Sequence, residues 1–207
     1  MFNQNQNKSG SMEQSSQLPP QQQFGGHEVM EVHEAIGALV GGLEHYTLFD
    51  EQIQDQQLSS IADRQRTFLT QLYNTILDTF KSGKDPAVKT QTYNMQQTQT
   101  NTTFGMQPST PKTPIQSMNE LNDECISSAF LGHLKGIATH FTTTALEATH
   151  PVLRRIFADS VPNIIEMAYE IYLYQNQNQY YQVPQLSQND MQSIINSFAP
   201  VQGNISH

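Results

Sequence analysis

The sequence predicts an all-α fold, a ferritin-like four-helix bundle in which a long crossover joins two helical hairpins. Four segments carry apolar residues in steps of three and four, the spacing of one helical face, and none shows the alternation of a strand. Short turns separate the first segment from the second and the third from the fourth, whereas a long polar stretch separates the two pairs. One bundle lets four such apolar faces share a core.

The first hairpin is expected upstream of residue 84. The first helix is predicted by regular apolar positions at Val29, Val32, Ile36, Leu39, Leu43 and Tyr46. Asp50 is the expected N-cap of the next helix. That helix carries Leu58, Ile61, Phe68, Leu69, Leu72, Ile76 and Phe80, and it should end at Ser82 and Gly83 because glycine readily adopts the left-handed conformation that closes a helix.

The second hairpin is expected between residues 119 and 181. Its first helix has an apolar stripe at Ile126, Phe130, His133/Leu134, Ile137, Phe141, Ala145 and Ala148. The chain should turn at His150 and Pro151, because proline cannot continue a helix but can begin one. Its second helix carries Leu153, Ile156, Ser160, Ile164, Met167, Ile171 and Tyr174. Pro162 falls inside this helix and predicts a bend near Ser160.

The polar segments set the predicted domain boundaries. Residues 1–26 form a disordered tail rich in Gln, Asn and Ser, residues 27–181 form the bundle, and residues 182–207 form a polar tail with a short docked helix at 190–198. The linker at about residues 84–116 is long enough to cross the bundle from end to end. A disordered linker between two hairpins would have the same composition.

Charge and hydropathy exclude two kinds of partner. The chain has 10 Lys and Arg against 19 Asp and Glu, a formal net charge of -9, and no basic stripe, so nucleic acid is not an expected partner. The sequence contains neither a long apolar run typical of a transmembrane segment nor a signal peptide at its start. Synthesis in the cytoplasm without export is therefore expected. An internal disulfide is excluded because Cys125 is the only cysteine.

One pattern resembles a metal site. Glu147 and His150 have the Glu-x-x-His spacing that ferritin-like di-metal proteins use twice, together with further glutamates, but no second such pair occurs. A metal site for iron or manganese would draw on the candidate ligands His33, Glu34, His133, His140, Glu147 and His150. The alternative is a half-hydrated polar layer at the edge of the bundle. We expect no catalytic residues and no metal or other cofactor.

Part of the chain resembles a known family. The residues that carry the resemblance are Leu121-Asn-Asp-Glu-Cys-Ile, Leu134-Lys-Gly-Ile, Ala145-Leu-Glu-Ala-Thr-His-Pro-Val-Leu-Arg154-Arg, Ala168-Tyr-Glu-Ile-Tyr and Tyr180-Tyr-Gln-Val-Pro184. Together they resemble the spore coat protein F family of endospore-forming bacteria. The family motif positions are Leu153, Arg154 and Tyr181. Their expected roles are a core anchor, a charge near the interhelical turn, and an aromatic group that packs the chain end against the bundle.

The resemblance implies a ferritin-like bundle and a structural, non-enzymatic role in the spore coat or an associated layer. Other spore proteins are then the expected partners, reached through the bundle surface and the Gln-rich arms, and a homodimer is a further possibility. Two alternatives stay open. One is a metal-binding ferritin-like protein that stores iron or manganese or uses it in redox chemistry, and the other is a dimeric helical adaptor.

Overall fold

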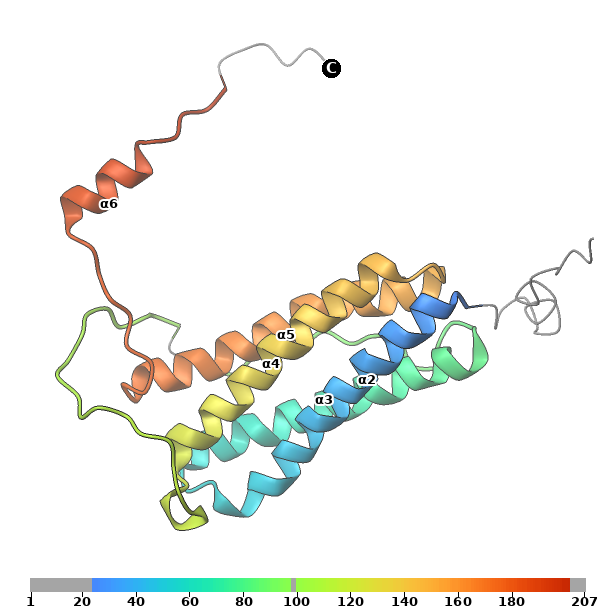
Figure 1. The fold of residues 1–207 in the computed structure, drawn as a ribbon, viewed down its shortest axis with the longest axis horizontal. Coiled ribbons are helices and arrows are strands. Elements are labelled where there is room, and N and C mark those ends of the chain that lie inside the picture. Colours follow the sequence, from blue (N-terminus) through green and yellow to red (C-terminus); the bar gives the residue numbers. More distant parts are fainter. Residues whose placement is uncertain (1–23, 98–99, 202–207) are drawn as a thin grey trace, which may run out of the picture.

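The computed structural model describes residues 24–97 and 100–201 and contains four long helices (Figure 1). They are α2 (Gly26–Phe49), α3 (Gln56–Ser82), α4 (Asp123–Glu147) and α5 (Pro151–Gln177). Helix α4 packs against α5 and α2, and α3 closes the bundle by packing against α2 and α5. Neighbouring helices run in opposite directions. The prediction of an all-α bundle is confirmed.

The core contains most of the apolar stripes that the sequence predicted. Val32, Leu39, Leu58, Ile76, Phe130, Phe141, Leu153, Ile164 and Ile171 are all fully buried. Tyr46 from α2 stacks on Phe130 from α4, with ring centroids 4.2 Å apart and planes inclined by only 12°. This packing joins the two hairpins, so the four helices share a single core.

The turn between α2 and α3 corrects one expectation. Asp50 is not an N-cap: it has helical backbone angles (φ -49°, ψ -53°) and begins a short 3-10 turn, Asp50–Gln52, directly after α2. The N-cap of α3 is Asp55, which has extended backbone and whose Oδ1 accepts a hydrogen bond from Gln57 N at 2.7 Å. The 3-10 turn delays the start of α3, and the sequence shows two plausible capping aspartates five positions apart.

The other predicted helix ends are confirmed. Helix α3 closes at Gly83, whose φ of 67° is left-handed and whose N–H donates to Thr79 O at 2.7 Å. The break between α4 and α5 falls at His150 and Pro151. Helix α5 continues through Pro162 without interruption, and Asn163 Nδ2 donates to the carbonyl of Asp159 at 2.9 Å. The bend expected near Ser160 stays a prediction.

The polar linker is an ordered crossover in its described residues. It leaves α3 at one end of the bundle and reaches a 3-10 turn, Met118–Glu120, and then α4 at the other end (Figure 1). Backbone N–H groups of the crossover donate hydrogen bonds to three polar side chains of α5. Tyr93 N donates to Asn163 at 2.7 Å and Gln96 N donates to Glu170 at 3.1 Å. Thr103 N donates to Asn176 at 2.7 Å. These side chains recur every six or seven residues, so they lie along one face of α5. The crossover therefore follows α5 in the same direction.

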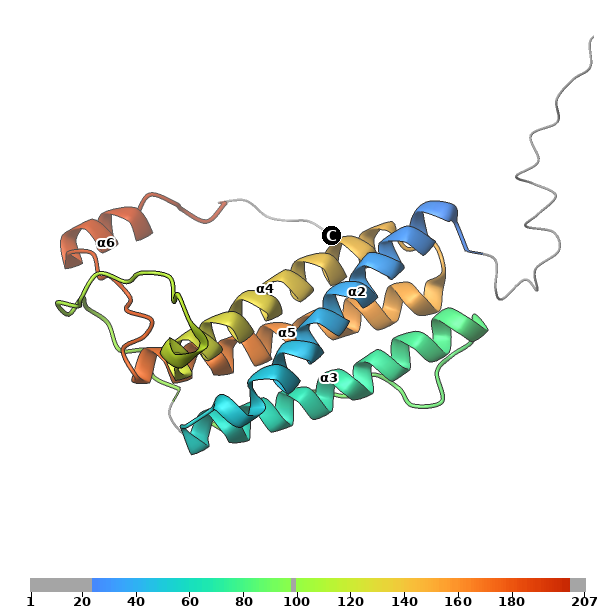
Figure 2. The ribbon, with the colours of Figure 1, turned by 60° about the horizontal axis from the view of Figure 1, so that its bottom comes forward.

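The two ends of the chain differ. The predicted N-terminal tail, residues 1–26, lies mostly outside the described residues, but Phe24 packs against Phe80 and His150. A helix does form near the predicted C-terminal position, α6 (Gln188–Ile195), yet it stands apart from the four long helices (Figure 2). No helix in the described part of the chain is long and apolar enough to cross a membrane.

Candidate functional site

The candidate metal ligands are spread along the bundle. His33 and Glu34 lie on the exposed surface of α2, where His33 Nδ1 is 3.5 Å from Glu34 Oε1. His140 is exposed on α4. Glu147 is the last residue of α4 and contacts His27, with Glu147 Oε2 3.6 Å from His27 Nδ1. Among residues 24–97 and 100–201, no group of three or more His, Cys, Asp or Glu side chains is placed to hold a metal ion.

His133, another candidate ligand, contacts a histidine that the sequence did not single out. The His133 ring on α4 packs against the ring of His45 on α2, with centroids 4.2 Å apart and planes inclined by 40°. His45 Nδ1 is 2.6 Å from Gly41 O and must donate to it, because a carbonyl oxygen can only accept. Burial and the neighbouring His45 lower the pKa of His133. This environment favours the neutral form of His133 at the edge of the bundle.

His150, the remaining candidate ligand, holds two helix ends together. It is the N-cap of α5: its Nδ1 accepts from Leu153 N at 3.4 Å, and its Nε2 donates to Gly83 O, the C-cap of α3, at 3.1 Å. Both ring nitrogens are thus occupied by the protein. Proline at 151 ends α4 before His150, so Glu147 and His150 do not share a helical face.

Glu28 completes this junction from a third helix. Its carboxylate is 1% exposed and accepts hydrogen bonds from Gly25 N at 3.2 Å, Thr149 Oγ1 at 2.7 Å and His150 N at 2.8 Å. The Thr-His-Pro turn therefore joins α2, α3, α4 and α5 at one end of the bundle. Local sequence does not reveal the contribution of Glu28, because Thr149 and His150 are more than 120 positions away.

The three family motif positions differ in burial and contacts. Leu153 is fully buried in the core, and Arg154 is exposed in the first turn of α5. Tyr181 is 41% exposed, and its ring packs edge-on against Tyr172 at 5.3 Å. Lys135 Nζ on α4 lies 5.7 Å from the centroid of the Tyr181 ring, a cation–π contact. Tyr181, which follows α5, is thereby held against both α4 and α5.

The most extensive polar cluster surrounds Glu170, which is fully buried on α5. Its carboxylate accepts from Arg64 Nη2 at 2.6 Å, from Gln65 Nε2 at 3.3 Å, from Gln96 N at 3.1 Å and from the Tyr93 hydroxyl. These donors come from α3 and from the crossover. The sequence alone does not single out Glu170, because the tertiary fold brings the crossover over it.

Tyr46 extends the cluster to α2. Its hydroxyl donates to Gln65 Oε1 at 2.6 Å, and Gln65 Nε2 also donates to Met167 O at 3.0 Å. Burial raises the pKa of both Tyr46 and Tyr93, and the hydrogen bond to Glu170 contributes further to the rise for Tyr93. Both phenols are therefore held protonated as donors. The cluster is an internal hydrogen-bond network in which Arg64 Nε is the buried polar atom left without a partner.

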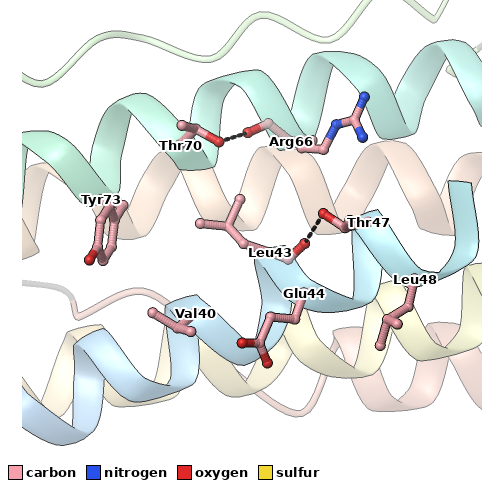
Figure 3. A pocket seen from close by; sticks show the side chains of 8 residues that line it. All are labelled: Val40, Leu43, Glu44, Thr47, Leu48, Arg66, Thr70 and Tyr73. Atoms are coloured by element: carbon pink, nitrogen blue, oxygen red, sulfur yellow. Dashed lines mark hydrogen bonds between the residues drawn. The ribbon is translucent and has the colours of Figure 1, made fainter.

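A surface groove lies between α2 and α3 (Figure 3). It has a volume of about 670 Å³ and is lined mainly by apolar groups. Val40, Leu43 and Leu48 come from α2, and Tyr73 comes from α3. Glu44 and Arg66 are its charged residues. The groove is an apolar surface that suits another protein segment better than a polar reaction.

Comparison with known proteins places these features in a family. Residues 122–184 match the family model described as the Coat F domain. The match covers α4, α5 and the turn that ends at Tyr181, which includes the Thr-His-Pro junction. The chain is also 44% identical over 179 residues to the spore coat protein F-like protein YhcQ of Bacillus subtilis (strain 168), and the alignment covers 86% of this chain and 82% of that protein.

A solved structure has the same fold. It is a crystal structure of a "putative spore coat protein" from Bacillus halodurans C-125, with a TM-score of 0.56, and the alignment covers 83% of this chain and 98% of the other. The identity between the two is 11%, so this likeness concerns the fold alone.

Proposed function

This chain belongs to the coat F family, and on that premise we propose that it is a structural, non-enzymatic component of the spore coat. The observation that carries the proposal is the internal use of the family region's polar groups. His150 caps one helix and bonds the end of another, while Glu170 accepts hydrogen bonds from α3 and the crossover. Residues occupied in this way hold helices together.

Other coat proteins are the proposed partners. The bundle presents exposed apolar side chains for such contacts at Met30 on α2, Leu146 on α4 and Ile165 on α5. The net charge of -9 favours a protein partner over a nucleic acid. A structural coat protein with these properties contributes stable bundles that associate through short apolar surfaces.

Localisation in spores tests the proposal. The chain, with a small epitope tag at its C-terminus, is to be produced during sporulation, and spore sections are to be labelled with gold-conjugated antibody. We expect label over the coat layers and recovery of the protein in the fraction that detergent and reductant extract from intact spores. Label confined to the spore core would overturn the proposal.

The proposal includes no metal cofactor, and elemental analysis tests this part. Protein purified without a metal-affinity tag is to be assayed for iron, manganese and zinc. We expect far less than one metal ion per chain. Near-stoichiometric metal that is lost in Glu147→Gln or His140→Ala would instead support the ferritin-like metal protein. Tyr169→Phe, which changes no candidate ligand, is the matched control.

A further inference from the structure

Helix α6 is a well-formed helix that none of the long helices covers. Its N-cap Ser187 accepts a hydrogen bond from Asp190 N at 3.1 Å and donates to Asp190 Oδ2 at 2.7 Å. These bonds give the helix a defined start. In both views of the ribbon α6 lies away from the bundle (Figures 1 and 2).

The apolar side chains of α6 form a stripe. Met191, Ile194 and Ile195 recur in steps of three and four, the spacing of one helical face, and Phe198 follows shortly after the helix ends. Ile194 is 56% exposed, Ile195 67% and Phe198 84%. An isolated helix of eight residues is marginal in water, since helices shorter than about 12 residues gain too few hydrogen bonds to offset the cost of nucleation. The stripe therefore requires a covering surface.

The groove between α2 and α3 matches this helix in length and chemistry. It extends along α2 from Val40 to Leu48, about 12 Å at 1.5 Å per residue, which is also about the length of α6. Its lining is mainly apolar, and its two charged residues, Glu44 and Arg66, have opposite signs. The arm over residues 184–201 carries one charge, Asp190, so its entry meets no strong repulsion.

The groove of the same copy is out of reach. The arm is fixed to the bundle at Val183, whose carbonyl accepts from Gly105 N at 2.9 Å and which forms a bridge with Phe104. Only residues 184–187 are free before α6, and they span at most about 14 Å. The path from the end of α5 around α3 crosses about two helix diameters, roughly 20 Å. A covering groove must belong to another molecule.

We infer that α6 docks in the α2/α3 groove of a second copy of this chain, and that the two copies exchange arms reciprocally. One short helix in one groove buries less surface than a stable interface, which covers about 800 Å² on each partner. Two exchanged arms double the buried area and leave no groove or arm uncovered. The inference deepens the proposed function by naming a partner, and it rests on that function only for its role in the coat.

Cross-linking of the full-length chain tests the exchange. Two variants are prepared in a Cys125→Ser background, one with Ile194→Cys and one with Leu48→Cys. One of the two carries a tag, so that the two chains differ in mass. The two are mixed, allowed to re-equilibrate and oxidised. We expect a disulfide between the two masses in high yield. A Ser193→Cys variant on the opposite face of α6 is the matched control, and it should cross-link to Leu48→Cys several-fold less.

Light scattering on the chain without added cysteines gives the second measurement. We expect twice the monomer mass, falling to the monomer mass in Ile194→Asp, while Ser193→Asp remains dimeric. A monomer for the unmodified chain, or a dimer that persists in Ile194→Asp, would overturn the exchange. A double variant carrying Leu48→Cys and Ile194→Cys that forms only an intramolecular disulfide would also overturn the exchange. None of these outcomes bears on coat localisation, which the labelling of spores tests separately.

Discussion

Glu170 is the residue at which α3, the crossover and α5 meet. A buried carboxylate is costly unless its oxygens are fully hydrogen-bonded, and here a guanidinium, an amide, a phenol and a backbone N–H all donate to it. The Arg64 side chain is 25% exposed, whereas the Glu170 side chain is fully buried. The network therefore fixes where the crossover lies more than it adds net stability.

Loss of the Tyr93 hydroxyl tests this role. We predict that Tyr93→Phe lowers the free energy of unfolding by about 1–3 kcal/mol, because it leaves a buried carboxylate oxygen with one donor fewer. Chemical denaturation followed by circular dichroism measures the change. Tyr169→Phe, at an exposed ring, is the matched control and should change stability by less than about 0.5 kcal/mol. Equal effects in the two variants would contradict the role given to the network.

The His45–His133 pair makes stability depend on pH. Burial and His45 lower the pKa of His133 below its ordinary value of 6.5, so the folded state binds a proton less readily than the unfolded state. Its contribution to stability is fully present above pH 6.5 and is lost as the pH falls through 6.5 towards the folded pKa. We predict a smaller loss of stability between pH 7.5 and 5.5 in His133→Gln than in the unmodified chain.

Thermal unfolding at a series of pH values measures this difference. His33→Gln, at an exposed histidine of α2, is the control and should follow the unmodified chain. Parallel curves for His133→Gln and the unmodified chain would show that His133 does not carry the effect.

Among the elements, the helices were predictable and the crossover was not. Apolar spacing, Gly83 and Pro151 each act within a few residues, so the sequence reveals the stripes and most of the helix ends. The exception was Asp50, because a 3-10 turn and two aspartates make the start of α3 ambiguous. The crossover is ordered by backbone hydrogen bonds to Asn163, Glu170 and Asn176, which only the tertiary fold brings near it. Polar composition alone does not distinguish such a strap from a disordered linker.

The same limit applied to the candidate site. The Glu-x-x-His spacing of Glu147 and His150 suggested a shared face, and the Pro151 break indicated that the face is lost. His150 instead forms a hydrogen bond with Gly83 at the end of α3, and Gly83 lies 67 positions away in the sequence. Local sequence carries no signal for such a contact.

Gly83 gives a prediction for a single helix end. We predict that Gly83→Ala lowers the free energy of unfolding by about 1–2 kcal/mol, because a Cβ is unfavourable at a φ of 67°. Denaturant titration measures the change. Gly136→Ala is the control: it lies within α4 with open space around its position, so alanine should be neutral or stabilising there. A neutral Gly83→Ala would mean that the helix end relaxes into another conformation.

The crossover itself can be examined by hydrogen exchange. We predict that the amide hydrogens of Tyr93 and Gln96 exchange at least tenfold more slowly than those of the exposed Ser109, Thr110 and Thr113, because Tyr93 and Gln96 donate to side chains of α5. Asn163→Ala should remove the protection of Tyr93 and leave the helices protected. Rapid exchange at both amides in the unmodified chain would show that the crossover is not held against α5.

At the scale of the whole molecule, arm exchange links stability to concentration. If two copies hold each other's α6, unfolding must release the partner, so the midpoint temperature of unfolding rises with protein concentration. We predict a rise of a few degrees between about 1 and 100 μM for the full-length chain. A chain ending at Pro184 keeps the four helices, the crossover and the Val183 bridge but lacks α6, and its midpoint should not change with concentration. Differential scanning calorimetry at several concentrations measures both. A concentration-independent midpoint for the full-length chain would contradict an exchanged dimer, whereas a truncated chain that fails to fold would show that α6 stabilises its own bundle.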